Sequence, residues 1–179
     1  MHQELILNKI NAVLEATDDA LVQKIVSAVD GANRIFVTGA GRSGLVSRFF
    51  AMRLVHSGYK VYMVGEIVTP SIQAGDLFVV ISGSGGTETL LPLVRKAKSV
   101  GAKIAVISMK GQSPMAELAD LVCQIGSGNE NSFGVVKGMP MGTVFELSTL
   151  VFLEAIVSYI VHEKGLTEEG MRALHANLE

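Results

Sequence analysis

Apolar residues along this chain fall into two alternating patterns, short uninterrupted runs and stretches with helical spacing. The short runs predict buried strands at residues 35–37, 60–64, 77–81, 104–107 and 121–125. Between these runs, apolar residues three or four positions apart predict helices at residues 43–56, 88–100 and 115–119. Strands that alternate with helices form parallel sheets with right-handed crossovers. We therefore expect an α/β fold with a five-stranded parallel sheet flanked by helices.

Helical patterns also lie before and after the predicted sheet core, which covers about residues 33–125. The spacing predicts one or two N-terminal helices within about 4–30, a long helix over about 143–164, and a short terminal helix over about 168–176. Residues 147–161 are apolar on nearly every face, which is not typical of a surface helix. Charged Glu146 and Glu154 leave no uncharged run of about 18 residues to span a bilayer. We expect a core helix that also forms a subunit interface, in a homodimer or homotetramer.

Composition limits the class of protein. The 179 residues, 49% of them hydrophobic and 18% charged, suit one folded domain spanning 1–179. Fifteen basic and seventeen acidic residues give no positive field for nucleic acid, and the first residues lack a signal-peptide pattern. A lone Cys123 forms no internal disulfide, so a reduced, cytoplasmic setting is expected. Because no His, Cys, Asp and Glu cluster has ligand spacing, no metal is expected.

Two of the predicted strands run directly into turns rich in glycine and hydroxyl groups. The first turn, residues 39–44, reads Gly-Ala-Gly-Arg-Ser-Gly, and the second, residues 82–87, reads Ser-Gly-Ser-Gly-Gly-Thr. Such turns direct backbone N–H groups and short hydroxyls at one point, with a helix N-terminus behind them. We therefore predict a phosphate site at the carboxyl edge of the sheet. Its candidate residues are Gly41, Arg42, Ser43, Ser82, Ser84 and Thr87.

Other interpretations of these turns remain open. The first turn matches the dinucleotide pattern G-x-G-x-x-G, and Glu66 stands where a ribose-binding carboxylate would lie. A small NAD(P)-binding protein is therefore one alternative. A P-loop is excluded because Gly44 is not followed by Lys and Ser or Thr. In the second turn, Thr87 could simply act as a helix N-cap, but a cap would leave Ser82 and Ser84 unexplained.

The two turns, and above all the second, resemble the sugar isomerase (SIS) domain family, whose S-x-S-x-x-T loop holds a sugar phosphate. The resemblance extends to the isomerases that interconvert D-arabino-3-hexulose 6-phosphate and fructose 6-phosphate, in the ribulose monophosphate pathway of formaldehyde fixation. It covers most of the chain, in segments 39–44, 50–54, 65–66, 69–71, 82–89, 141–143, 145–146, 175 and 177–178. It implies a single three-layer domain of flavodoxin-like or Rossmann-like type, no cofactor, and a functional pairing with hexulose-phosphate synthase.

The resemblance also implies catalytic residues. Glu146 corresponds to the family's catalytic glutamate, the base that moves a proton between two carbons through a cis-enediol. His175 lies in a tail segment like that of the family and is the candidate proton shuttle, in its own or a neighbouring subunit. Glu66, a further substrate-binding candidate, is the reserve base. Alternatively, Glu146 completes a capping box with Thr143, or the chain is a binding module without catalysis.

Overall fold

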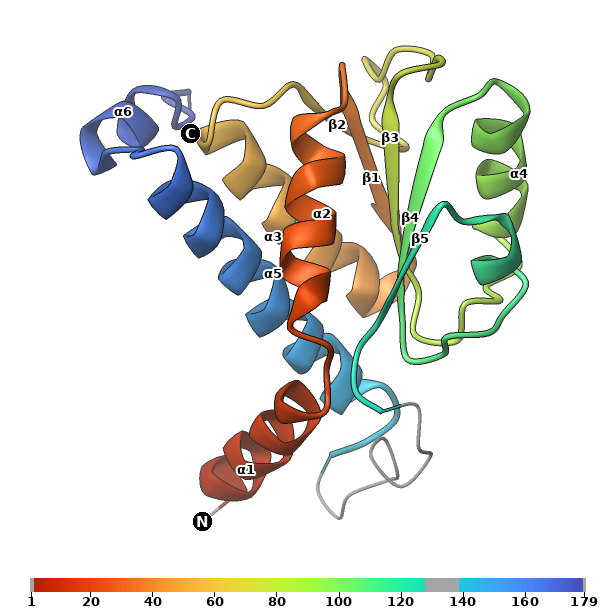
Figure 1. Cartoon of the computed structure of the whole chain (residues 1–179), viewed down its shortest axis with the longest axis vertical. Coiled ribbons are helices and arrows are strands. Elements are labelled where there is room, and N and C mark those ends of the chain that lie inside the picture. Colours follow the sequence, from red (N-terminus) through yellow and green to blue (C-terminus); the bar gives the residue numbers. More distant parts are fainter. Residues whose placement is uncertain (1, 128–138, 179) are drawn as a thin grey trace.

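The computed structural model, which describes residues 2–127 and 139–178, contains five parallel strands in one sheet of order β2-β1-β3-β4-β5 (Figure 1). The strands are β1 (Ile35–Gly39), β2 (Val61–Met63), β3 (Leu77–Ile81), β4 (Lys103–Ser108) and β5 (Leu121–Gln124). All four strand pairs are parallel. The expected fold class, a parallel sheet flanked by helices, is therefore confirmed.

Helices cover both faces of this sheet. They are α1 (His2–Glu15), α2 (Ala20–Asp30), α3 (Gly41–His56), α4 (Leu91–Ser99), the 3₁₀ turn η1 (Ala116–Leu118), α5 (Thr143–Glu163) and α6 (Glu168–Ala173). Figure 1 shows α2, α3 and α5 on one face and α4 on the other. Alternate strand residues supply the two cores, because Val37 and Val79 face the first layer whereas Phe36 and Phe78 face the second.

The long helix α5 is part of the core, as its apolar sequence predicts. It packs against α1, α2 and α3. Its buried side chains are Val144, Phe145, Ser148, Thr149, Phe152, Leu153, Ile156, Val157 and Ile160. By length and composition alone, α5 is long and apolar enough to cross a membrane. Buried core helices of globular proteins often share these two properties.

Two expected helices differ from the structure, and the two alternative capping roles are also wrong. Helix α4 begins at Leu91 rather than at residue 88, and its N-cap is Leu90, not Thr87. The hydroxyl of Thr87 instead contacts Ser82 within the turn. Gly142, not Thr143, is the N-cap of α5, and the Thr143 hydroxyl donates to the Pro140 carbonyl. The alternative in which Glu146 completes a capping box with Thr143 is therefore wrong, and the expected helix 115–119 is a single 3₁₀ turn.

Candidate active site

The two glycine-rich turns lie side by side. The strand order reverses between β1 and β3, because the chain goes from β1 to β2 on one side and returns to β3 on the other. Gly39 at the end of β1 pairs in register with Ile81 at the end of β3. Open α/β sheets bind ligands at such a reversal point, beyond the carboxyl ends of the strands. The sheet topology therefore supports the predicted position of the site.

The second turn, residues 82–87, is closed by its own hydroxyl groups. Ser82 is buried, and its Oγ lies 2.9 Å from the Thr87 Oγ1 and accepts the Gly85 N–H at 3.2 Å. Ser84 is exposed, and its Oγ accepts the Gly86 N–H at 3.2 Å. Gly85 has a φ of +62°, and a Cβ there would lie 2.2 Å from the Ser113 Oγ. The turn is thus a compact, serine-rich loop, which we call the serine loop.

In the first turn, glycine allows β1 and α3 to approach each other closely. A Cβ on Gly44 would lie 2.7 Å from the Gly39 carbonyl oxygen, and a Cβ on Gly39 would lie 2.8 Å from the Ser43 backbone. No side chain fits in either place. The G-x-G-x-x-G pattern therefore has a packing role here, and it places Gly41, Arg42 and Ser43 in the first turn of α3.

Glu146 lies in the first turn of α5 and forms an ion pair with the Arg42 Nε. The Glu146 side chain is only 13% exposed, whereas that of Arg42 is 59% exposed. The preceding residue, Phe145, brings the start of α5 to the serine loop, since a Cβ on Gly83 would lie 3.1 Å from its ring. The structure therefore brings together the first turn, the serine loop and Glu146.

Glu66 lies apart from this group. It follows β2 and pairs with Arg48 at 2.6 Å, with about half of each side chain exposed. Arg48 is six positions after Arg42 on α3, about 9 Å along the helix at 1.5 Å per residue. The two candidate bases are thus each bound to an arginine of the same helix, but only Glu146 is next to the serine loop.

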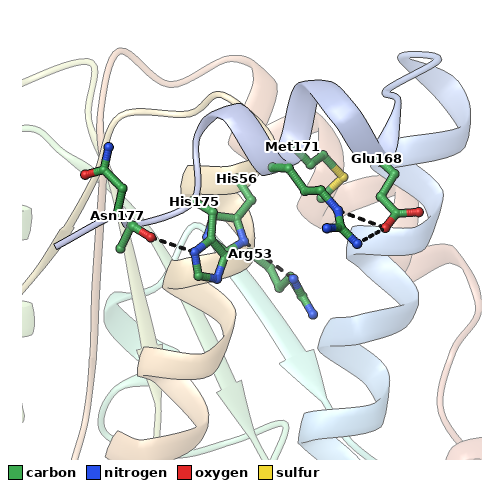
Figure 2. A pocket seen from close by; sticks show the side chains of 8 residues that line it. Arg53, His56, Glu168, Met171, His175 and Asn177 are labelled. Carbon is green, nitrogen blue, oxygen red and sulfur yellow. Dashed lines mark hydrogen bonds and ion pairs between the residues drawn. The ribbon is translucent and has the colours of Figure 1, made fainter. Parts of the chain in front are cut away.

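His175 lies at the far end of α3. Its ring stacks on that of His56, with centroids 4.9 Å apart and an interplanar angle of 26° (Figure 2). The fourteen positions from Arg42 to His56 correspond to about 21 Å along the helix. Within a single chain, His175 therefore lies far from Glu146.

His56 is a residue whose environment the sequence did not reveal. A histidine at the end of a helix typically suits the helix dipole as an exposed cation, but His56 is 5% exposed and packs against His175 of the tail. The two histidines line an open cleft of about 610 Å³ with residues of α3 and α6. The other residues that line it are Arg53, Glu168, Met171, Arg172, Ala176 and Asn177. No local sequence pattern connects the end of α3 with the tail.

Comparison with known proteins defines the class of this chain. The model of the SIS domain family matches residues 30–153, which include both glycine-rich turns and Glu146. The chain belongs to the SIS domain family.

Individual relatives narrow this class. The chain is 68% identical over 178 residues to a 3-hexulose-6-phosphate isomerase of Methylomonas aminofaciens, covering 99% of this chain and 98% of the relative. It is 38% identical to a 3-hexulose-6-phosphate isomerase of Bacillus subtilis, over 97% of this chain and 95% of the relative. A crystal structure from Methanococcus jannaschii, for which a molecular function of 3-hexulose-6-phosphate isomerase is inferred, has a TM-score of 0.88 at 35% identity and covers 99% of both chains.

Proposed function

We propose that this protein is an isomerase that interconverts D-arabino-3-hexulose 6-phosphate and fructose 6-phosphate. The observation that carries the proposal is the 68% identity, over nearly the whole chain, to a protein named for this activity. The position of Glu146 beside the serine loop supports it, because a base next to an anion site is what the reaction requires. We place the enzyme in the cytoplasm and in formaldehyde fixation, functionally paired with hexulose-phosphate synthase.

The serine loop is the proposed anchor for the phosphate of the substrate. Hydroxyls of Ser82, Ser84 and Thr87 and backbone N–H groups of the loop supply the donors, and Gly41 and Ser43 adjoin them from the first turn. A phosphate held there fixes the sugar relative to α5. Proton transfer between C2 and C3 then depends on orientation, which a strong anion anchor provides.

Glu146 is the proposed base. Its carboxylate removes the proton from C2 of the 3-hexulose phosphate, and the electron pair moves to form a cis-enediol with the oxygen on C3. The protonated Glu146 then returns the proton to C3, so that the carbonyl is at C2 in fructose 6-phosphate. Arg42, which pairs with Glu146, can stabilise negative charge that develops on the enediol oxygens. Glu66, the reserve base, would bind substrate from the neighbouring loop.

Proton exchange between the two oxygens is assigned to His175, and this role requires a second subunit. Within one chain about 21 Å of helix separates the two ends of α3. The outer face of α3 carries an exposed apolar stripe at helical spacing, Leu45, Phe49, Met52 and Val55, which are 67%, 45%, 54% and 39% exposed. A second copy of this chain is the proposed occupant of this stripe, in a dimer or tetramer.

The stripe favours an antiparallel pairing of the two α3 helices. Phe49 lies midway between Arg42 and His56, with seven positions on either side. A two-fold axis at Phe49 therefore places the His56 end of one helix opposite the Arg42 end of the other. The His175 of each subunit would then complete the site of its partner, and the monomer alone would be inactive.

A coupled assay tests the function. Hexulose-phosphate synthase generates the 3-hexulose phosphate, and fructose 6-phosphate formation is followed through glucose 6-phosphate and NADP reduction. Product formation at enzyme-dependent rates supports the proposal. Stabilisation by fructose 6-phosphate without turnover would identify a binding module instead, and stabilisation by NAD(P) alone would identify a dinucleotide-binding protein.

A mixing experiment tests the shared site. Glu146→Gln and His175→Ala, each with strongly reduced turnover alone, are combined under conditions that exchange subunits. In a mixed dimer one of the two sites has both wild-type residues, so activity should return to about a quarter of the wild-type value. If both residues act within one chain, mixing restores nothing.

A further inference from the structure

The tail that carries His175 is largely exposed in the part that the structure describes. None of the residues of α6 is buried, and Leu174 and Leu178 on either side of His175 are 49% and 100% exposed. A proton shuttle needs a defined ring orientation, because proton transfer depends on hydrogen-bond geometry. The orientation of the His175 ring therefore depends on its side-chain contacts, two of which lie within the residues that the structure describes.

One such contact fixes which ring nitrogen is protonated. The Nδ1 of His175 lies 2.9 Å from the Ala176 carbonyl oxygen. Since a carbonyl oxygen only accepts, Nδ1 is the donor and carries a proton. Nε2 is then the nitrogen that exchanges a proton with substrate oxygens.

The second contact is the face of His56. Ring centroids 4.9 Å apart and an angle of 26° lie within the range of offset aromatic stacking (Figure 2). Unlike the tail, His56 is firmly held, because it is buried at the end of the long helix α3. Its Nδ1 lies 3.4 Å from the Arg53 Nη1. A guanidinium only donates, so this nitrogen of His56 is the acceptor of that contact.

We infer that His56 is a positioning residue for the isomerisation: its buried ring is the platform on which the His175 ring is held in its working orientation. This inference rests on the role proposed for His175. His56 itself contacts no reacting atom, and its effect passes through the stacked ring. A purely structural role, in which His56 only fills space below the tail, is the competing explanation.

Two substitutions at His56 separate these explanations. His56→Phe keeps a flat ring for stacking, whereas His56→Ala removes it. We expect His56→Ala to lower kcat by roughly 3- to 10-fold, the factor expected for a lost aromatic pair, with KM within about two-fold. His56→Phe should retain most of the wild-type kcat. The matched control is His162→Ala on α5, since the His162 side chain is 86% exposed.

A double-mutant cycle tests whether His56 acts through His175. In the His175→Ala background, His56→Ala should cause no further loss of kcat, because the ring that it positions is already absent. Melting temperatures of all variants establish that each one is folded, and His56→Phe provides a second folded test if His56→Ala is unstable.

The inference is overturned if folded His56→Ala turns over at the rate of His162→Ala, if His56→Phe is as slow as His56→Ala, or if the two losses in the cycle simply add. The proposed function has its own, separate failure. Wild-type turnover by His175→Ala would remove the role of His175 and this inference with it. A slow His175→Ala together with a normal His56→Ala would overturn the inference alone.

Discussion

The replacement of Glu146 by Gln is the most direct test of the proposed chemistry. Gln keeps the size of the side chain and can still accept a hydrogen bond from Arg42, but it cannot remove a proton from carbon. General base catalysis contributes about 10²- to 10⁴-fold, so kcat should fall by that factor, which is about 3 to 5 kcal/mol in the barrier. KM should change much less, because the phosphate anchor is on the serine loop.

Stability should hardly change in the same variant. The capping alternative is absent, since Gly142 is the N-cap of α5 and Thr143 bonds to Pro140. What remains is the ion pair with Arg42, whose side chain is 59% exposed. Pairs with so much exposure contribute at most about 1 kcal/mol, which corresponds to a shift of about 2–4 °C in Tm for a domain of this size.

Glu66→Gln is the matched control, because Glu66 also pairs with an arginine of α3. The assay is kcat and KM from the coupled reaction, with Tm measured on the same preparations. Near wild-type turnover by Glu146→Gln with an inactive Glu66→Gln would assign the base to Glu66. Near wild-type turnover by both variants would refute a glutamate base altogether.

Three further predictions concern the anchor, the core and the oligomer. Thr87→Ala should raise KM by roughly 5- to 100-fold and weaken competitive inhibition by inorganic phosphate, whereas exposed Thr89→Ala should change neither. Burial raises the pKa of the Cys123 thiol to about 12 from 9.0, so iodoacetamide should label it only after unfolding. Because the unfolded thiol ionises first, Cys123 should lower stability as pH rises from about 9 to 12, a decline that Cys123→Ala should lack in urea titrations. Phe49→Glu on the α3 stripe should reduce the mass measured by light scattering to that of one chain or of a smaller assembly; an unchanged mass places the interface elsewhere.

The sheet could be predicted from the sequence because buried parallel strands leave an unmistakable pattern. Every residue of Leu77–Ile81 is buried, so the strand appears as an uninterrupted apolar run. Helix starts were harder to predict. Thr87 has a typical capping residue type, but its hydroxyl contacts Ser82 within the serine loop. A turn in which the Thr87 carbonyl accepts the N–H groups of Leu90 and Leu91 then precedes α4.

Without the family resemblance, which supplied Glu146 and His175, the site could be predicted only where its residues lie in one local motif. Both glycine-rich turns were found, because each combines glycines and hydroxyls within six positions. The partners of Arg42 and His56 could not be found in this way. Arg42 meets Glu146 across 104 positions, and His56 meets the tail only because α6 folds back over the end of α3. Side-chain contacts of this kind depend on how helices pack, which no local spacing encodes.

The close contact between Gly39 and Gly44 has a mechanical consequence. It fixes the first turn of α3 against the sheet beside Arg42, so that any change in the angle of the helix at this contact would be largest at its His56 end. Over the roughly 21 Å of helix between Arg42 and His56, a tilt of α3 by roughly 5° displaces the His56 end by about 2 Å. A displacement of this size would break hydrogen-bond geometry at a site built from both ends of the helix. Gly39 and Gly44 contact no substrate, but they would thus limit how far the two ends of α3 can deviate from the geometry that the site requires.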